Sequence, residues 1–198
     1  CFVLDPKIEG DVWMTNFRII PGNKEVVHHV GLWLDEKGLS SEIAGEKGYY
    51  NCFGDVGLEV SLIGGWNPGY PPYDPPKEAG IHIPENAKII MQIHYHIHED
   101  YEEPPKDSTM LNLEIIKNEP IFKTLVWQWG SVHDSRFDEN GNQMPNGLVP
   151  GPYDEKGYPD FVIPANVKDH EETIMFTLPD NFPEVSLFGI GTHMHYLG

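Results

Sequence analysis

The sequence has little positive charge and little cysteine, and it lacks long apolar runs. Only 13 of its 198 residues are Lys or Arg, against 31 Asp or Glu, so the formal net charge is −18. Such an acidic surface repels phosphates, which excludes nucleic acid and anionic lipid headgroups as favoured partners. No apolar run of about 18 residues is present, so no membrane span is predicted. The hydrophobic content of 39% predicts a folded chain, and the whole profile fits a secreted or periplasmic protein.

Cys1 and Cys52 are the two cysteines of the chain, and no Cys-x-x-Cys spacing is present to favour zinc. The sequence leaves them open as free thiols, metal ligands or a disulfide. A bridge would contribute about 4 kcal/mol in the chain-entropy treatment of loop closure and would suit an oxidising compartment. Because the chain begins without Met and ends at Gly198 directly after a His-rich segment, we expect a mature piece of a longer protein.

Proline and glycine are abundant, with 18 and 20 residues spread along the chain. They prohibit long helices and separate short apolar runs rich in β-branched and aromatic residues, which predicts an all-β fold. One short helix is expected over residues 40–46, with Ser40 as its cap. The expected strands are residues 12–20, 26–34, 60–63, 88–98, 110–116, 122–129, 173–178 and 185–193.

Two stretches rich in Pro and Gly, residues 66–80 and 140–160, predict long surface loops. In the first of them, aromatic rings either pack the loop rigidly or line the rim of a pocket; these are Trp66, Tyr70 and Tyr73. A change of character near residues 118–120 separates one complete set of strands from the next. We therefore expect two antiparallel β-sandwich domains, residues 1–118 and 119–198, the second of them incomplete.

Seven of the ten histidines fall in three tight clusters. The clusters are His28-His29, His94-Tyr95-His96-Ile97-His98 and His193-Met194-His195, whereas His82, His133 and His170 stand alone. Side chains at i and i+2 of a strand point the same way, so His193 and His195 present two imidazoles to one point. The three histidines of the middle cluster also share a side, but they span about 13 Å, so at most two of them reach one ion.

His28 and His29 are adjacent, and neighbours on a regular strand face opposite sides of a sheet. Both reach one ion only if a β-bulge or a strand end intervenes. Each cluster also has an interpretation without metal, as a solvated strand face or as one buried and one exposed histidine. Together the clusters favour imidazole-only sites, which suit copper, zinc, iron or nickel. Ligand types alone do not choose among these metals.

A cupin is a rival interpretation of the middle cluster. His96 and His98 followed by Glu102 imitate the spacing of the metal ligands in those β-barrel proteins. The glycines that flank this motif are missing, and residues 99–103 are typical of a solvated acidic turn. A cupin-like dioxygenase would use iron within a single barrel.

The order of the histidine clusters resembles that of the copper- and ascorbate-dependent monooxygenases, the family of peptidylglycine α-hydroxylating monooxygenase and dopamine β-hydroxylase. The likeness covers nearly the whole chain and is carried by VVHHVGLWL at 26–34, MQIHYH at 91–96 and THMHYLG at 192–198. NCF at 51–53 and the leading Cys1 add to it, and LIGGWNPG and HMHYLG are similar to bacterial members. The resemblance implies two jelly-roll sandwiches, each holding one copper across an open cleft.

The resemblance implies a role for five of the clustered histidines. His28, His29 and His94 match the ligands of an electron-transferring copper, whereas His96 and His98 lie outside that motif. His193 and His195 match two ligands of an oxygen-binding copper. The third ligand of the second copper is a methionine further downstream in the family, beyond the end of this chain.

An enzymatic function is also implied by the resemblance: hydroxylation of an activated C–H bond with dioxygen and with ascorbate or a similar one-electron donor. Cys1 and Cys52 match a family disulfide, and Gln92 matches a residue associated with electron passage. Gly191 stands where the peptide-amidating branch carries an arginine, which argues against peptidylglycine among the small-molecule and peptide substrates. The alternative from another class is a copper-binding β-sandwich module without turnover.

Overall fold

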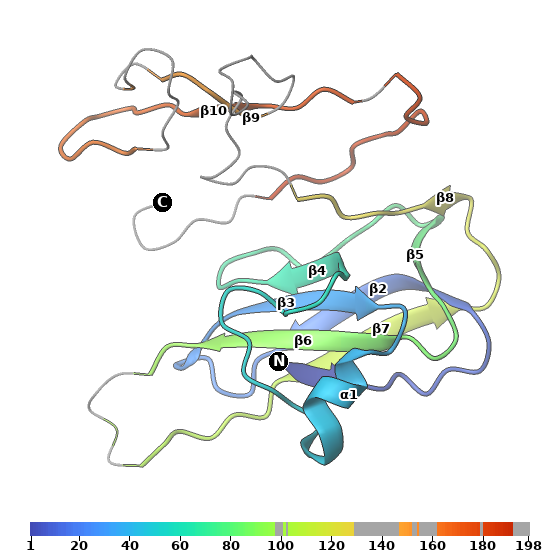
Figure 1. Cartoon of the computed structure of the whole chain (residues 1–198). Coiled ribbons are helices and arrows are strands. Elements are labelled where there is room, and N and C mark those ends of the chain that lie inside the picture. Colours follow the sequence, from blue (N-terminus) through green and yellow to red (C-terminus); the bar gives the residue numbers. More distant parts are fainter. Residues whose placement is uncertain are drawn as a thin grey trace. The chain divides into compact units, whose positions relative to one another are not determined.

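The computed structural model describes residues 1–97, 101, 103–128, 147–151, 154, 162–178 and 180–191 (Figure 1). Strands and loops dominate these residues, which confirms the predicted all-β class. Their helices are α1 (Ser40–Ala44) and the 3₁₀ turn η1 (Gly45–Lys47). No helix in this described part is long and apolar enough to cross a membrane. The chain divides into two compact units, Cys1–Trp127 and Gln128–Gly198, and the domain limits expected at residues 118 and 119 stay a prediction.

The first unit is a β-sandwich whose described strands form two four-stranded sheets. Sheet one has the order β1-β6-β3-β4, with antiparallel neighbours. Its strands are β1 (Phe2–Leu4), β6 (Lys88–Tyr95), β3 (Val27–Asp35) and β4 (Ser61–Trp66). Sheet two has the order β7-β2-β5-β8, and its β5 and β8 are parallel. Its strands are β7 (Met110–Ile116), β2 (Val12–Ile20), β5 (Ala79–Ile83) and β8 (Phe122–Lys123).

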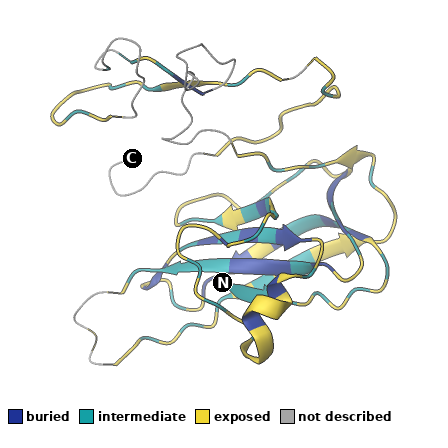
Figure 2. Cartoon of the chain, viewed as in Figure 1, coloured by how far each residue is buried: buried dark blue, intermediate teal, exposed yellow. Residues whose placement is uncertain are grey.

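The hydrophobic core of the first unit is formed by the inward-facing side chains of these sheets (Figure 2). Buried and less buried residues alternate along much of β2 and β3, so each sheet has one face that packs into the core. Fully burying one such aliphatic side chain contributes about 1.5–3 kcal/mol. The cluster consists of Val12, Met14, Phe17, Ile19, Val27, Val30, Leu32, Leu34, Ile63, Ile81, Ile83, Ala87, Ile89 and Met91.

Most of the expected strands are present. β2 and β7 begin and end where the sequence predicts, and the strands expected at 26–34, 60–63, 88–98 and 173–178 are present with different ends. The strand expected over 122–129 is present as β8 and is wrong across 124–128; residue 129 lies outside the described residues. The strand expected over 185–193 is wrong across 185–191, where the described residues are exposed and form no strand. An apolar run without a half-buried pleated surface to join gains nothing from strand pairing.

The start of α1 differs from the prediction, because Leu39 occupies the cap position and Ser40 is the first helical residue. The carboxylate of buried Asp35 accepts the backbone N–H of Ser40 at 2.7 Å and that of Lys37 at 3.2 Å. Burial raises the pKa of Asp35, but hydrogen bonds from Ser40 and neighbouring backbone N–H groups outweigh burial, so the net pKa is lowered. Asp35 therefore anchors the helix to the end of β3.

The loop expected over residues 66–80 is shorter than predicted. β4 ends at Trp66, and β5 begins at the buried Ala79. Within the loop, Tyr73 stacks on Phe17 of β2, with ring centroids 4.7 Å apart. Trp66 also packs against the core, so these two rings close the sandwich.

In the second unit, the described strands are β9 (Gly147–Val149) and β10 (Thr173–Met175), which pair antiparallel. β9 corrects the prediction of an uninterrupted surface loop over 140–160. Gly147 and Leu148 are buried there. No strand signal is present in the sequence at β9, since three residues are too few for a period to be recognised.

Candidate metal centre

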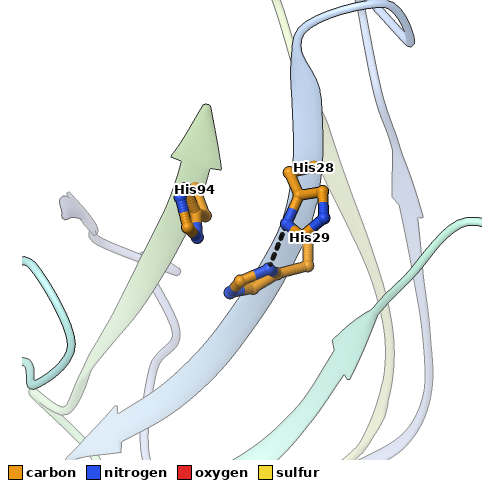
Figure 3. Close-up of side chains that lie close together, drawn as sticks. All are labelled: His28, His29 and His94. Atoms are coloured by element: carbon orange, nitrogen blue, oxygen red, sulfur yellow. Dashed lines mark hydrogen bonds between the residues drawn. The ribbon is translucent and has the colours of Figure 1, made fainter. Parts of the chain in front are cut away.

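His28 and His29 lie on β3, and His94 lies on the neighbouring strand β6 (Figure 3). Val27 pairs with Tyr95 and His29 pairs with His94, so the register shifts between these two pairs. His28 is therefore one extra residue on β3, which is a β-bulge. This is the irregularity that two adjacent histidines need in order to face one point.

The burial pattern of β3 shows what the bulge does. Val27 and Val30 are both 2% exposed, although residues three apart on a regular strand lie on opposite faces. The extra residue between them turns His28 and His29 to the same outer face of sheet one, with His28 exposed and His29 half-buried. His94 is directly opposite His29 in the ladder, so its side chain shares that face.

The three imidazoles converge on one another (Figure 3). Their ligand nitrogens lie within 4.8 Å of each other, and Nδ1 of His28 is 3.0 Å from Nδ1 of His29. The ring centroid of His28 lies 5.1 Å from that of His29 and 5.2 Å from that of His94, and the centroids of His29 and His94 are 4.7 Å apart. Their planes are inclined by 63°, 70° and 77°, so the rings meet edge to face around a shared space.

These separations fit ligands of a common metal ion. Two imidazoles with metal–nitrogen bonds of about 2.0–2.1 Å, as for zinc, place their ring centroids roughly 4.5–5.5 Å apart when the angle at the metal is about 90–120°. The observed centroid separations of 4.7, 5.1 and 5.2 Å all lie in this interval. Within the described residues, no cysteine or carboxylate belongs to the group, so the donor set is nitrogen only.

The chain matches no protein-family model and no curated protein. What the site can do chemically therefore follows from its donors and their surroundings. Neutral imidazole nitrogens bind copper, zinc, iron and nickel. The exposed position of His28 leaves one side of the group open to a metal ion, a reductant or another small molecule.

The segment after η1 is fixed beside the histidines. Cys1 and Cys52 form a disulfide with a Cα–Cα distance of 5.7 Å, within the usual range, which confirms the pairing that the resemblance implied. Gln92 precedes His94 by two residues on β6 and donates from Nε2 to the carbonyl oxygen of Cys52 at 3.1 Å. Gln92 thereby holds the disulfide segment against the outer face of sheet one. Its expected part in an electron path stays a prediction.

Phe53 is a site residue to which the sequence assigned no role of its own. It follows Cys52, and its ring lies against that of His94, with centroids 5.8 Å apart and planes inclined by 76°. The residue is 87% exposed, so its ring lies beside His94 at the protein surface. Its position next to a disulfide cysteine is the signal that could have found it.

A carboxylate anchors the strand end that carries His94. Asp107 accepts the Tyr95 hydroxyl at 2.9 Å, the Asn23 N–H at 2.8 Å and the Thr109 N–H at 3.2 Å. Burial raises the pKa of Asp107, but these hydrogen bonds outweigh burial and lower it overall. Burial and the Asp107 carboxylate raise the pKa of the Tyr95 hydroxyl. The network ties the end of β6 to the turn before β3 and to the start of β7, on the side of the bulge.

The isolated histidines that the structure describes have carboxylate partners. Nε2 of His82 lies 3.1 Å from a carboxylate oxygen of Asp11, and Nε2 of His170 lies 2.6 Å from one of Glu172. This is the ordinary setting expected for single histidines.

The second predicted metal cluster, His193 and His195, lies outside the described residues, as do His98 and His133. The ligand role of His193 and His195 therefore stays a prediction. Of the sequence-predicted ligands, the structure brings together the three of the first unit.

Proposed function

We propose that this chain belongs to a copper- and reductant-dependent monooxygenase that hydroxylates an activated C–H bond with dioxygen. The observation that carries the proposal is the convergence of His28, His29 and His94 at a bulge of β3. A bulge that turns two adjacent imidazoles toward a third on the next strand is an unusual local device, and bulges are enriched at functional sites. The order of the three histidine motifs supports copper as the ion.

Within this proposal, each part of the site has a distinct task. His28, His29 and His94 would hold one copper, and the exposed side of His28 would give an external donor such as ascorbate access to it. His193 and His195 would supply two ligands of a second copper. When bound, the metals would supply one-electron storage and oxygen activation. In the overall reaction, one oxygen atom of dioxygen would enter the product alcohol, and the other would leave as water with two electrons from the donor and two protons.

The charge and the disulfide support this assignment. A net charge of −18 raises the local concentration of cations, including metal ions, around the protein. The Cys1–Cys52 bridge is typical of chains that fold in an oxidising compartment, which fits the secreted or periplasmic location that we propose. The substrate class is a small molecule or a peptide.

The proposal is tested by copper titration of the full chain and of the variants His28→Ala, His94→Ala and His82→Ala. His82 is the matched control, because it is a partly exposed histidine that pairs with Asp11 outside the site. We expect the first two variants to bind one copper fewer than the parent and His82→Ala to bind as the parent does. Equal copper binding by all three variants would overturn the proposed metal centre.

Turnover is tested separately by ascorbate-driven oxygen uptake of the copper-loaded protein with a panel of substrates. Substrate-dependent uptake that disappears in His94→Ala is the expected result. Copper binding without any such uptake would identify a non-catalytic copper-binding module. A preference for iron on reconstitution, measured by elemental analysis, would identify a cupin-like dioxygenase instead.

A further inference from the structure

The bulge that turns His28 toward the other two imidazoles is held differently on its two sides. On one side, the ladder between β3 and β6 runs without a register shift from the His29–His94 pair to the far end of both strands. On the other side, it reaches the Val27–Tyr95 pair, where β3 begins and β6 ends. His28 is therefore the ligand whose position depends on how this terminal pair is fixed.

The turn that leads into β3 fixes the Val27 side of this pair. The carbonyl oxygen of Asn23 accepts the backbone N–H of Val27 at 3.0 Å and that of Val26 at 3.3 Å. The carbonyl oxygen of Val26 in turn accepts the backbone N–H of His96, just beyond β6, at 2.8 Å. Because Val27 directly precedes His28, a shift of Asn23 would move His28 through one hydrogen bond and one peptide bond.

Asp107 connects this turn to the other strand of the terminal pair. One of its carboxylate oxygens accepts the backbone N–H of Asn23 at 2.8 Å. The other accepts the Tyr95 hydroxyl at 2.9 Å and the backbone N–H of Thr109 at 3.2 Å. Hydrogen bonds to a charged acceptor are the stronger class. The carboxylate thus fixes both members of the pair, Val27 through the turn and Tyr95 directly.

We propose that Asp107 is a positioning residue of the metal centre, which keeps His28 within reach of the ion that the other two histidines would hold. The inference rests on the proposed function. Asp107 is not a member of the ligand group, so it acts through the turn and the terminal pair. A bulge leaves its extra residue without a ladder partner. Such a residue keeps one orientation only while the chain on both sides of it is held.

The test measures copper(II) affinity in the full chain carrying His193→Ala and His195→Ala, so that the predicted second site does not contribute. Into this parent we introduce Asp107→Asn. The amide offers one acceptor and one donor in place of two acceptors, so either the Asn23 N–H or the Thr109 N–H faces another donor. We expect the affinity to fall about tenfold, which is the lower end of the range for residues that orient metal ligands.

Asp35→Asn is the matched control. Asp35 is also a carboxylate that accepts backbone N–H groups, those of Lys37 and Ser40, but it lies at the end of β3 opposite the bulge. Both variants should lose stability in thermal melts, whereas Asp35→Asn should bind copper(II) as the parent does. An equal loss of copper affinity in Asp35→Asn and Asp107→Asn would overturn the inference, because general destabilisation would then account for both.

A residue-specific readout separates positioning of His28 from loosening of the whole site. Diethyl pyrocarbonate reacts with imidazole nitrogens that no metal occupies, and peptide mass spectrometry reports the rate for each histidine. In copper-saturated Asp107→Asn, we expect His28 to react several times faster than in the parent, while His29 and His94 keep the parent rates. An unchanged rate for His28, or an equal rise for all three histidines, would overturn the inference.

Two further variants keep the outcome decisive. If Asp107→Asn does not fold, Tyr95→Phe takes its place, because it removes a single hydrogen bond from the same carboxylate; its copper affinity should fall about two- to fivefold, and parent-like binding would refute the proposal. His94→Ala tests the site itself. If it binds copper as the parent does, the proposed metal centre fails, whereas lost binding in His94→Ala beside parent-like Asp107→Asn refutes the role of Asp107 alone.

Discussion

Replacing Cys1 and Cys52 together by serine is expected to destabilise the first unit by about 4 kcal/mol, because the bridge restricts the unfolded chain. The magnitude follows from the structure: the bridge joins cysteines 51 residues apart, and the closed loop contains β1, β2, β3 and α1. Domains are stable by only about 5–15 kcal/mol in total. The loss is therefore a large fraction of the free energy of unfolding.

Urea unfolding followed by tryptophan fluorescence measures this effect. We expect the midpoint to fall by roughly 1.3–4 M urea, since the slope for small proteins is about 1–3 kcal/mol per molar. Reductant should lower the midpoint of the wild type equally and leave that of the double variant unchanged. A midpoint within about 0.5 M of the wild type would refute the reasoning. The two 2.9 Å backbone hydrogen bonds between Cys1 and Tyr50 would then hold the segment without the bridge.

Three further substitutions test other parts of the structure. Asp107→Asn should lower the free energy of unfolding by about 1.5–3 kcal/mol at neutral pH. Folding lowers the pKa of Asp107, so its carboxylate stabilises the fold fully above the unfolded pKa of about 3.9. This stabilisation is lost as the pH falls through the folded pKa. Urea midpoints of both proteins between pH 7 and pH 2 check this, and a gap that does not narrow in acid contradicts it. Gly64→Ala should lower the free energy of unfolding by about 1–3 kcal/mol, because the added methyl group would clash with the Phe17 ring. Gly189→Ala is the control in thermal melts, because a methyl group there meets nothing within contact distance. Equal melting temperatures for Gly64→Ala and the wild type would count against the clash. Phe53→Ala should weaken copper binding about two- to tenfold, which corresponds to the energy of one aromatic pair. Tyr49→Ala is the control and should bind copper like the wild type, because the Tyr49 ring lies against Phe2 instead. An unchanged affinity for Phe53→Ala would show that its ring does not support His94.

Strand prediction succeeded where the local pattern and the tertiary environment agree. β2 and β7 pair with each other over most of their lengths, and both are runs rich in apolar, β-branched and aromatic residues bounded by turn residues, so their limits follow from composition and from the flanking turns. β1 and β5 were missed because they are short and the latter follows a Pro-rich loop. For residues 185–191 a strand was predicted that the structure does not contain, since an apolar run forms a strand only where a neighbouring strand edge is available to pair with it.

The candidate site divides in the same way. The sequence identifies the histidines as candidate ligands, and it shows that His28 and His29 can bind one ion only if the strand alternation is interrupted between them. It does not place that break, because a shift by one residue costs little locally and is decided by which residues of β3 and β6 pair.

By itself, the sequence determined the all-β class, the limits of β2 and β7, and the histidines that the chain offers as ligands, because alternation and residue chemistry are local properties. The tertiary structure alone decided that the bulge falls at His28 and that Gln92 and the disulfide hold the Phe53 segment beside His94. These depend on contacts between residues far apart in sequence, whose distances are set only when the strands pair and the sheets pack.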